Sequence, residues 1–216
     1  MPRFRLPSFT RVAALAAAVA LPAADAAAQS LHPSFQLPRT VQREYNAAIA
    51  DGDGTTAFLF QWHEGLTSAS GFRFDGGLLD IDESDVHFLL GATYQRQLNN
   101  AGTEVPLDLL LTVGGQAVLG DLVALEVPVG VSIGRRFPLD GAFALTPYAH
   151  PRVALQYCNE CGADGDSDTD LGIGVDFGVD FEISTRMSLR GAFMIGSDDA
   201  EAIGIGLAWR PGGLRR

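Results

Sequence analysis

The sequence contains no lysine, so arginine supplies all 15 of its basic residues, against 26 acidic ones. With a formal net charge of −11, the chain lacks the positive excess that nucleic-acid binding needs, and we expect no nucleic-acid partner. Cysteine is scarce too, since only Cys158 and Cys161 occur, too few for a zinc site on their own. Beyond residue 28 no run of eighteen apolar residues occurs, which argues against a membrane-spanning helix.

Residues 1–28 have the composition of a secretory signal peptide. Three arginines precede a stretch rich in alanine and valine, and three alanines follow at positions 26–28. A membrane-anchoring helix is the alternative, but a proline and an aspartate interrupt the stretch before it reaches the ~20 residues of a span. We therefore predict export and cleavage near Ala28, which leaves 12 arginines and 25 acids in the remaining chain.

Residues 171–183 (LGIGVDFGVDFEI) alternate without a break between apolar side chains and glycine or carboxylate. Successive side chains of a strand point to opposite faces, so this segment predicts a strand with one apolar and one small or acidic face. Comparable alternation recurs along the chain, separated by turn residues. It predicts ten strands, near residues 41–50, 55–63, 71–79, 86–98, 105–119, 122–137, 142–157, 169–184, 187–196 and 202–210.

The apolar face continues from strand to strand, and small or charged residues lie opposite it. A barrel in lipid turns its apolar face outward and its polar face inward, so we predict an all-β, up-and-down transmembrane barrel of about ten strands. The alternative is a secreted or periplasmic lipocalin-like ligand-binding barrel, with the same stripe facing inward. Pro128, Pro147 and Pro151 fall inside predicted strands, where a closed barrel has no free edge for them. Bulges, or strand portions that rise above the membrane, could accommodate these prolines. If neither does, eight strands is the alternative count.

With its ten-strand alternation and acidic turns, the chain resembles the small outer-membrane β-barrel proteins of Gram-negative bacteria over residues 41–210. The resemblance implies an integral, monomeric outer-membrane protein. Its expected partners are outer-membrane lipid, lipopolysaccharide and the barrel-assembly machinery. It implies a structural, surface-interaction or minor permeability role, with no enzymatic activity and no cofactor. Residues 29–40 are expected to form a flexible periplasmic lead-in. Trp209 is followed by a tail, residues 211–216, where many members of the family end on an aromatic residue.

Aromatic side chains gather near the turns that this topology places in the periplasm. Such a cluster is typical of an aromatic girdle at a membrane interface. The predicted girdle consists of Trp62, Phe72, Tyr94, Phe137, Phe143 and Trp209.

Charged and polar side chains on the inward face should pair with one another, because a narrow lumen desolvates them. We expect their ion pairs to plug an acidic lumen, and an open path would favour cations, since acids outnumber arginines six to three. The predicted lumen network consists of Arg73, Asp75, His87, Asp108, Glu126, His150, Arg152, Asp176, Asp180, Glu182 and Arg190.

His150 and His87 are interpreted as hydrogen-bonded lumen histidines, since neither has a second ligand at helical spacing. A membrane-embedded lipid hydrolase is a third function. Lipid A deacylases resemble this chain in size and use a histidine two residues before a serine. That spacing occurs here only at His32 and Ser34, within the lead-in, and His150 has no nucleophile beside it in the sequence.

The segment 158–170 (CNECGADGDSDTD) is the most distinctive of the predicted surface loops. Its alternating aspartates resemble the start of an EF-hand calcium loop, which makes Asp164, Asp166, Asp168 and Asp170 weak candidate metal ligands. The match then fails, because Thr169 occupies the glycine position and Val175 the position of the bidentate glutamate. Export permits a Cys158–Cys161 disulfide, which would staple only its own loop.

Overall fold

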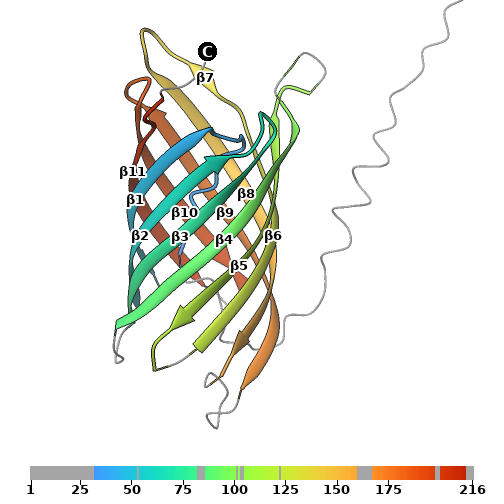
Figure 1. Cartoon of the computed structure of the whole chain (residues 1–216), viewed down its shortest axis with the longest axis vertical. Helices are drawn as coiled ribbons and strands as arrows, with labels where there is room; N and C mark the ends of the chain where they lie inside the picture. Colours follow the sequence, from blue (N-terminus) through green and yellow to red (C-terminus); the bar gives the residue numbers. More distant parts are fainter. Residues whose placement is uncertain are drawn as a thin grey trace, which may run out of the picture.

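The computed structural model describes residues 32–52, 54–81, 86–100, 102, 105–121, 123–159, 167–197 and 200–212. The predicted signal peptide lies outside these residues, as do Cys161, Asp164 and Asp166. The described chain forms a single antiparallel β-barrel (Figure 1). No helix in this part of the chain is long and apolar enough to cross a membrane.

Eleven strands make up the sheet, of which ten are long. Their bounds are β1 (Arg43–Gly52), β2 (Thr55–Gly65), β3 (Ser70–Ile81), β4 (Val86–Asn99), β5 (Asp108–Leu119), β6 (Val123–Gly134), β7 (Phe137–Pro138), β8 (Ala144–Cys158), β9 (Asp168–Glu182), β10 (Met187–Gly196) and β11 (Glu201–Trp209).

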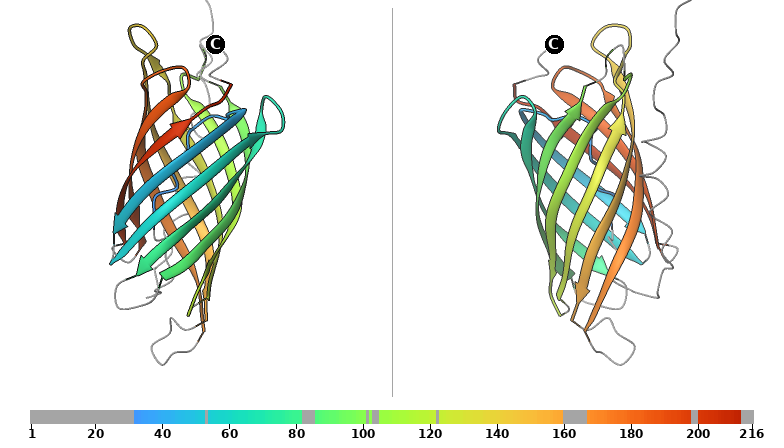
Figure 2. Two further views of the ribbon diagram at one scale, coloured as in Figure 1. Left: turned by 60° about the vertical axis from the view of Figure 1, so that its left-hand side comes forward. Right: turned by 90° about the vertical axis from the view of Figure 1, so that its right-hand side faces the viewer.

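Each long strand pairs with its neighbours in the sequence, and two further pairings close the sheet on itself. Strand β1 pairs with β11 from Tyr45–Trp209 to Asp51–Ile203. Strand β6 pairs with β8, while the two residues of β7 extend that edge of β8. Two further views show the closed wall (Figure 2). The prediction of an up-and-down barrel of ten strands is confirmed. We call the end where β1 begins and β11 ends the terminal end, at the top of Figure 1, and the opposite end the far end.

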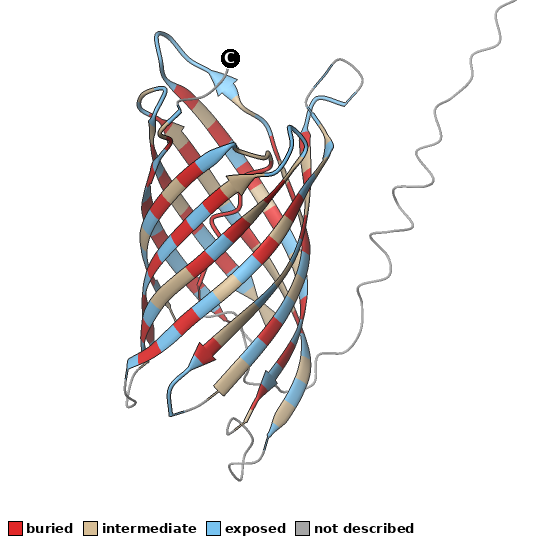
Figure 3. Ribbon diagram, in the orientation of Figure 1, coloured by how far each residue is buried: buried red, intermediate tan, exposed pale blue. Residues whose placement is uncertain are grey.

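The apolar faces of the strands point outward. Phe58 and Phe60 on β2 and Ile203 and Ile205 on β11 are all more than half exposed. On β9 the acidic positions Asp176, Asp180 and Glu182 are buried instead. Figure 3 shows the resulting chequered pattern of burial along each strand. A lipocalin-like barrel requires the reverse orientation of the apolar stripe, so that alternative does not fit this fold.

The strand prolines interrupt the pairing locally without shifting its register. Pairing between β5 and β6 stops at Val113–Val129 and resumes in the same register at Gln116–Glu126, on either side of Pro128. Pairing between β6 and β8 likewise skips Pro151. Pro147 lies beyond the last residue pair between β6 and β8, which joins Gly134 to Tyr148. Ten strands therefore accommodate the prolines through local gaps in the pairing, without a change of register.

Residues 32–40, which we name the lumen segment, differ most from the sequence-based expectation. The prediction of a flexible periplasmic lead-in is wrong for these residues. His32, Ser34, Phe35, Gln36 and Leu37 are buried, and the segment runs inside the barrel, where Figure 3 shows it in red. The segment has no strand periodicity, but it carries an aromatic ring and several hydrogen-bonding groups that the lumen satisfies.

Candidate functional site in the barrel lumen

Phe35 anchors the lumen segment in an apolar part of the lumen. Its side chain is fully buried and packs in one cluster with inward-facing residues of β1 to β5 and β10, which are Ala50, Ala57, Leu59, Leu79, Leu89, Val118 and Ala192. The backbone of Phe35 has φ 49°, a left-handed conformation that a bulky residue adopts only when its surroundings impose it. The packing of the ring is that imposing contact.

Polar groups of the lumen segment bond to strands on opposite sides of the barrel. The carbonyl oxygen of Ser34 accepts hydrogen bonds from Gln61 on β2 and Arg73 on β3. The side-chain oxygen of Gln36 accepts from Arg73 and from Gln95 on β4. The carbonyl oxygen of Gln36 accepts from Ser132 on β6 at 2.7 Å. The segment therefore satisfies its own backbone groups by cross-linking the interior wall.

A group of ion pairs spans the lumen toward the terminal end. Arg190 on β10 lies 2.8 Å from Glu44 on β1 and 2.8 Å from Asp180 on β9. Arg210, directly after β11, approaches the same two carboxylates at 2.5 and 3.3 Å. All four side chains are nearly or completely buried. Two positive and two negative charges thus neutralise one another away from water, as buried charges require.

A second group of ion pairs lies around the middle of the lumen segment. Arg73 bonds Asp75 at 2.9 Å on the same strand. Arg152 on β8 lies 3.4 Å from Glu126 on β6 and 3.3 Å from Asp176 on β9. These pairs connect three strands through one guanidinium group, which favours a rigid interior.

Glu182 marks the mouth of the lumen at the terminal end. Its carboxylate accepts hydrogen bonds from Arg39 of the lumen segment at 2.5 Å and from Arg136, which follows β6, at 2.6 Å. The hydrogen bond with Glu182 raises the pKa of Arg136 above its usual value. Arg39 thereby ties the end of the lumen segment to β9.

All eleven residues of the predicted lumen network lie on the inward face. Ten are buried, and the side chain of Arg152 is 8% exposed. The structure brings Arg73 to Asp75, Arg152 to Glu126 and Asp176, and Arg190 to Asp180. His87 lies apart from these groups, and its ring packs against Gly120.

The lumen is closer to neutral than the sequence suggested. Four further charged residues meet the predicted ones: Glu44, Arg39, Arg136 and Arg210. Among the described residues, seven carboxylates and six arginines therefore lie in the lumen or at its mouth. The expected excess of three acids is therefore reduced to one. Glu44 lies near the start of a strand, and the three arginines lie outside the long strands, so alternation within the strands does not reveal their charges.

His150 contacts two hydroxyl groups and one carboxylate. Its Nδ1 lies 2.8 Å from the Ser34 hydroxyl and 3.2 Å from Asp176, and its Nε2 lies 2.9 Å from the Thr112 hydroxyl. Ser34 also donates to Asp176 at 2.5 Å. The lumen segment thus supplies the hydroxyl neighbour that the sequence around His150 lacks.

This arrangement differs from a nucleophilic relay at Ser34. A relay needs the hydroxyl on one imidazole nitrogen and the carboxylate on the other. Here Ser34 and Asp176 share Nδ1, and the Ser34 proton is directed to the carboxylate, which can only accept. Thr112 does lie on the opposite nitrogen, but its side chain is buried. The four groups satisfy one another's hydrogen bonds and hold the lumen segment against β5, β8 and β9.

A small cavity remains between the lumen segment and the inward faces of β3 to β6 and β8. Thr112, Gln116 and Glu126 line it, together with His32 and His150. About 20 Å³ of the cavity can hold the centre of a water molecule, which is room for one or two waters. His32 donates from Nδ1 to the Pro33 carbonyl at 3.0 Å, so its Nε2 is left as an acceptor. The site is the size of a water site, far smaller than a pocket for an organic ligand.

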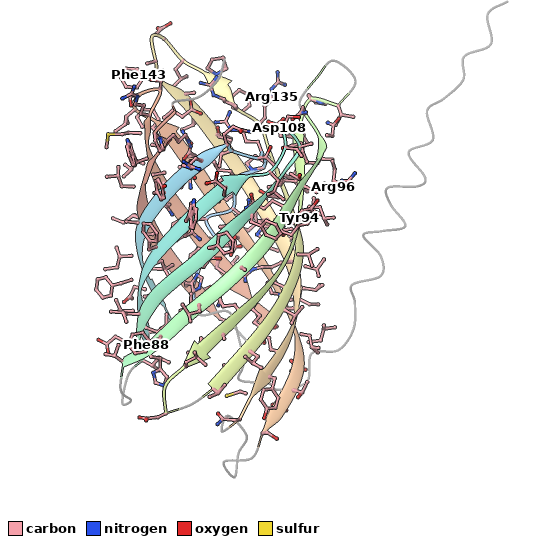
Figure 4. The ribbon with its side chains drawn as sticks, viewed as in Figure 1. Phe88, Tyr94, Arg96, Asp108, Arg135 and Phe143 are labelled. Carbon is pink, nitrogen blue, oxygen red and sulfur yellow. The ribbon has the colours of Figure 1, made fainter. Side chains whose placement is uncertain are left out.

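The remaining predicted residues lie at the ends of the barrel. Asp168 and Asp170 are the first and third residues of β9. No group of three or more metal-ligating side chains occurs among the described residues. Cys158 is buried at the end of β8 and disulfide-bonded. The aromatic residues of the predicted girdle lie toward the terminal end, where Figure 4 labels Tyr94 and Phe143. Tyr45 joins them, stacked between Trp209 and Phe60.

Comparisons with known proteins give low similarity. No protein-family model matches the chain, and no curated protein matches it. Among solved structures, a KdgM porin in complex with disordered oligogalacturonate is 6% identical, with a TM-score of 0.41, over 79% of this chain and 99% of the porin. The outer membrane protein Omp33 of Acinetobacter baumannii is 12% identical, with a TM-score of 0.38, over 84% of this chain and 100% of Omp33. The attachment invasion locus protein Ail of Yersinia pestis is 10% identical, with a TM-score of 0.31, over 77% and 91%. Because these identities and TM-scores are low, the fold is described from the pairing of its own strands.

Proposed function

We propose that this chain is an integral outer-membrane β-barrel whose lumen is closed by its own N-terminal segment, with a structural or surface-interaction role. The observation that carries the proposal is the inverted distribution of polarity. Apolar side chains cover the outer face of the barrel, and charged side chains fill its interior. Water favours the opposite distribution, whereas the hydrocarbon core of a membrane requires this one.

The lumen segment supports a closed state. Phe35 fills the apolar part of the lumen, and Ser34 and Gln36 bond to the walls around it. The Arg190–Glu44 and Arg210–Asp180 pairs fill the lumen toward the terminal end. A barrel of ten strands has a narrow interior that side chains can fill, so permeation is a minor role in this proposal.

The same features support an orientation in the membrane. Because the number of long strands is even, β1 begins and β11 ends on the same side of the membrane. In bacterial barrels this is the periplasmic side. The predicted signal peptide is consistent with export. Outer-membrane lipid, lipopolysaccharide and the assembly machinery are the proposed partners, and a monomer is the proposed state.

A lipid hydrolase is less well supported than this structural role. The Thr112–His150–Asp176 contacts are the observation in its favour. A hydrolase also needs space for its substrate beside the reacting hydroxyl, and the adjoining cavity accommodates only one or two waters.

Two measurements on the chain from residue 29 onward test the proposal. The chain is refolded in detergent and run on an SDS gel with and without boiling. We expect the unboiled sample to migrate faster, as a closed barrel does, and planar-bilayer recordings to show no steady conductance. A chain that folds in plain buffer without a mobility shift would refute the membrane barrel. A shifted chain with steady, cation-selective conductance would instead refute the closed lumen.

A further inference from the structure

Among the described residues, three arginines differ from the other seven in having no carboxylate partner. Of the ten arginines in the described part of the chain, seven lie within 4.0 Å of a carboxylate, namely Arg39, Arg43, Arg73, Arg136, Arg152, Arg190 and Arg210. The other three, Arg96, Arg135 and Arg186, make no ion pair with the described residues and are exposed. Most of the described arginines are thus neutralised by a carboxylate of the chain, whereas the positive charge of these three is not.

All three unpaired arginines lie at the terminal end, each beside an aromatic residue of the predicted girdle. Arg96 follows Tyr94 by two residues on the outer face of β4. The guanidinium of Arg135 lies 5.6 Å from the centre of the Phe137 ring. Arg186 directly precedes Met187, which pairs with Trp209 across β10 and β11. Figure 4 labels Arg96 and Arg135 toward this end.

The far end has the opposite charge. Its exposed charged residues among those described include Asp51, Asp80, Asp121 and Glu201, and the sequence places no arginine in the turns between β1 and β2, β3 and β4, β5 and β6, or β10 and β11. At the terminal end the described residues include one exposed acid outside the ion pairs, Asp140, against these three arginines. A negatively charged ligand would therefore be repelled from the far end more strongly than from the terminal end.

We propose that Arg96, Arg135 and Arg186 form a basic collar that binds the phosphate groups of anionic glycerophospholipids around the terminal end. This inference rests on the proposed membrane barrel. Tyrosine and tryptophan mark the level of lipid headgroups, so guanidinium groups beside them lie at the depth of the phosphates. The planar guanidinium donates two parallel hydrogen bonds to a phosphate, which makes arginine well suited to this contact.

The source of the phosphate is the phospholipid leaflet rather than lipopolysaccharide. In the proposed orientation the terminal end faces the periplasm, where the leaflet consists of phospholipid. Lipopolysaccharide lies in the outer leaflet, beside the acidic far end. Because its phosphates and the far-end carboxylates have the same sign, the far-end carboxylates do not bind these phosphates directly.

Tryptophan fluorescence offers a direct test, because both tryptophans of the chain, Trp62 and Trp209, lie at the terminal end. The refolded chain is placed in phosphatidylcholine vesicles that contain a small fraction of brominated lipid, which quenches nearby indole rings. Brominated phosphatidylglycerol is compared with brominated phosphatidylcholine. A single arginine at a membrane surface favours an anionic lipid by about fivefold. We expect phosphatidylglycerol to associate about two to five times more strongly than phosphatidylcholine.

The variant R96Q/R135Q/R186Q should lose this preference and bring the ratio close to one. Arg43→Gln is the matched control, since Arg43 is also exposed at the terminal end but is bonded to Glu64 at 2.6 Å, and it should keep the preference. Equal quenching of the unchanged chain by the two lipids would overturn the collar, and so would a stronger preference for brominated lipid A. If neither lipid quenches the tryptophans and the gel mobility does not shift, the membrane barrel itself fails.

Discussion

At the scale of single residues, Arg190 has the most demanding position in the lumen. Its guanidinium is fully buried between Glu44 and Asp180. Replacing Arg190 with methionine leaves two buried carboxylates with Arg210 as their remaining cation. Removing one partner of a buried ion pair costs about 3–5 kcal/mol, and we expect a loss of that size in the free energy of unfolding. Urea unfolding in detergent, followed by tryptophan fluorescence, measures it.

The control for this prediction is Arg43→Gln. Arg43 is paired with Glu64 at the surface, where water screens both charges. We expect little change in the unfolding midpoint. An Arg190→Met variant as stable as Arg43→Gln would show that Arg210 alone is sufficient to balance the two carboxylates.

Gly178 is a second residue whose position allows little change, because a neighbouring side chain occupies the space beside it. It faces Tyr148 across the β8–β9 pairing, and a Cβ at position 178 would lie 2.2 Å from Cζ of the tyrosine ring. Gly178→Ala must displace this buried ring, which costs about 1–3 kcal/mol as overpacking. Gly191→Ala on the neighbouring strand is the control, because a Cβ there meets nothing within 4 Å. Equal unfolding midpoints for the two alanine variants would contradict the prediction.

At the scale of elements, the proposed closed state depends on the lumen segment. Phe35→Ala removes the ring that fills the apolar cluster. We expect the free energy of unfolding to fall by about 3–5 kcal/mol and bilayer recordings to show conductance absent from the unchanged chain. Phe58→Ala is the control, because it removes a phenyl ring from the outer face, where Phe58 is 54% exposed. We expect bilayer recordings of this variant to show no conductance. Silent recordings from both variants would assign lumen closure to the ion pairs instead of Phe35.

The strands were predictable from the sequence because one physical constraint acts on each of them separately. Every strand has a lipid-type face and a lumen-type face, so alternation alone identifies elements such as 171–183 and their bounds within a few residues. The same alternation predicts that the side chains of Arg73, Asp176 and Arg190 point into the lumen.

The lumen segment and its partners could not be predicted in this way. Residues 32–40 adopt no repeating conformation, so their burial depends on a lumen that exists only after ten strands have closed. Glu44 and Arg210 lie at opposite ends of the barrel sequence, and their contact depends on the β1–β11 pairing. Strand alternation carries no information on either. The absence of acidic residues between His32 and Thr40, opposite an interior rich in carboxylates, is the one sequence feature that was compatible with burial.

At the scale of the whole molecule, charge is divided between the two ends. The chain has no lysine, so trypsin can cut only after arginine, and the exposed arginines in turns, Arg135 and Arg186, lie at the terminal end. In intact bacterial cells we expect external trypsin to leave the barrel whole, and permeabilising the outer membrane to allow cleavage at these two positions. Mass spectrometry of the fragments identifies the sites.

A protease that cuts beside aspartate provides the opposite control. Asp80 and Asp121 are exposed at the far end, so this protease should act on intact cells. Tryptic fragments that end at Arg135 or Arg186 without permeabilisation would reverse the proposed orientation.

The contacts of Ser34 also constrain the order in which the protein can assemble. Ser34 is made before every strand, yet its hydroxyl bonds to His150 and Asp176, which follow it by 116 and 142 residues. Bringing such distant residues together costs chain entropy that only later contacts repay. The first segment of the barrel to be synthesised therefore cannot complete its contacts before β8 and β9 have joined the sheet.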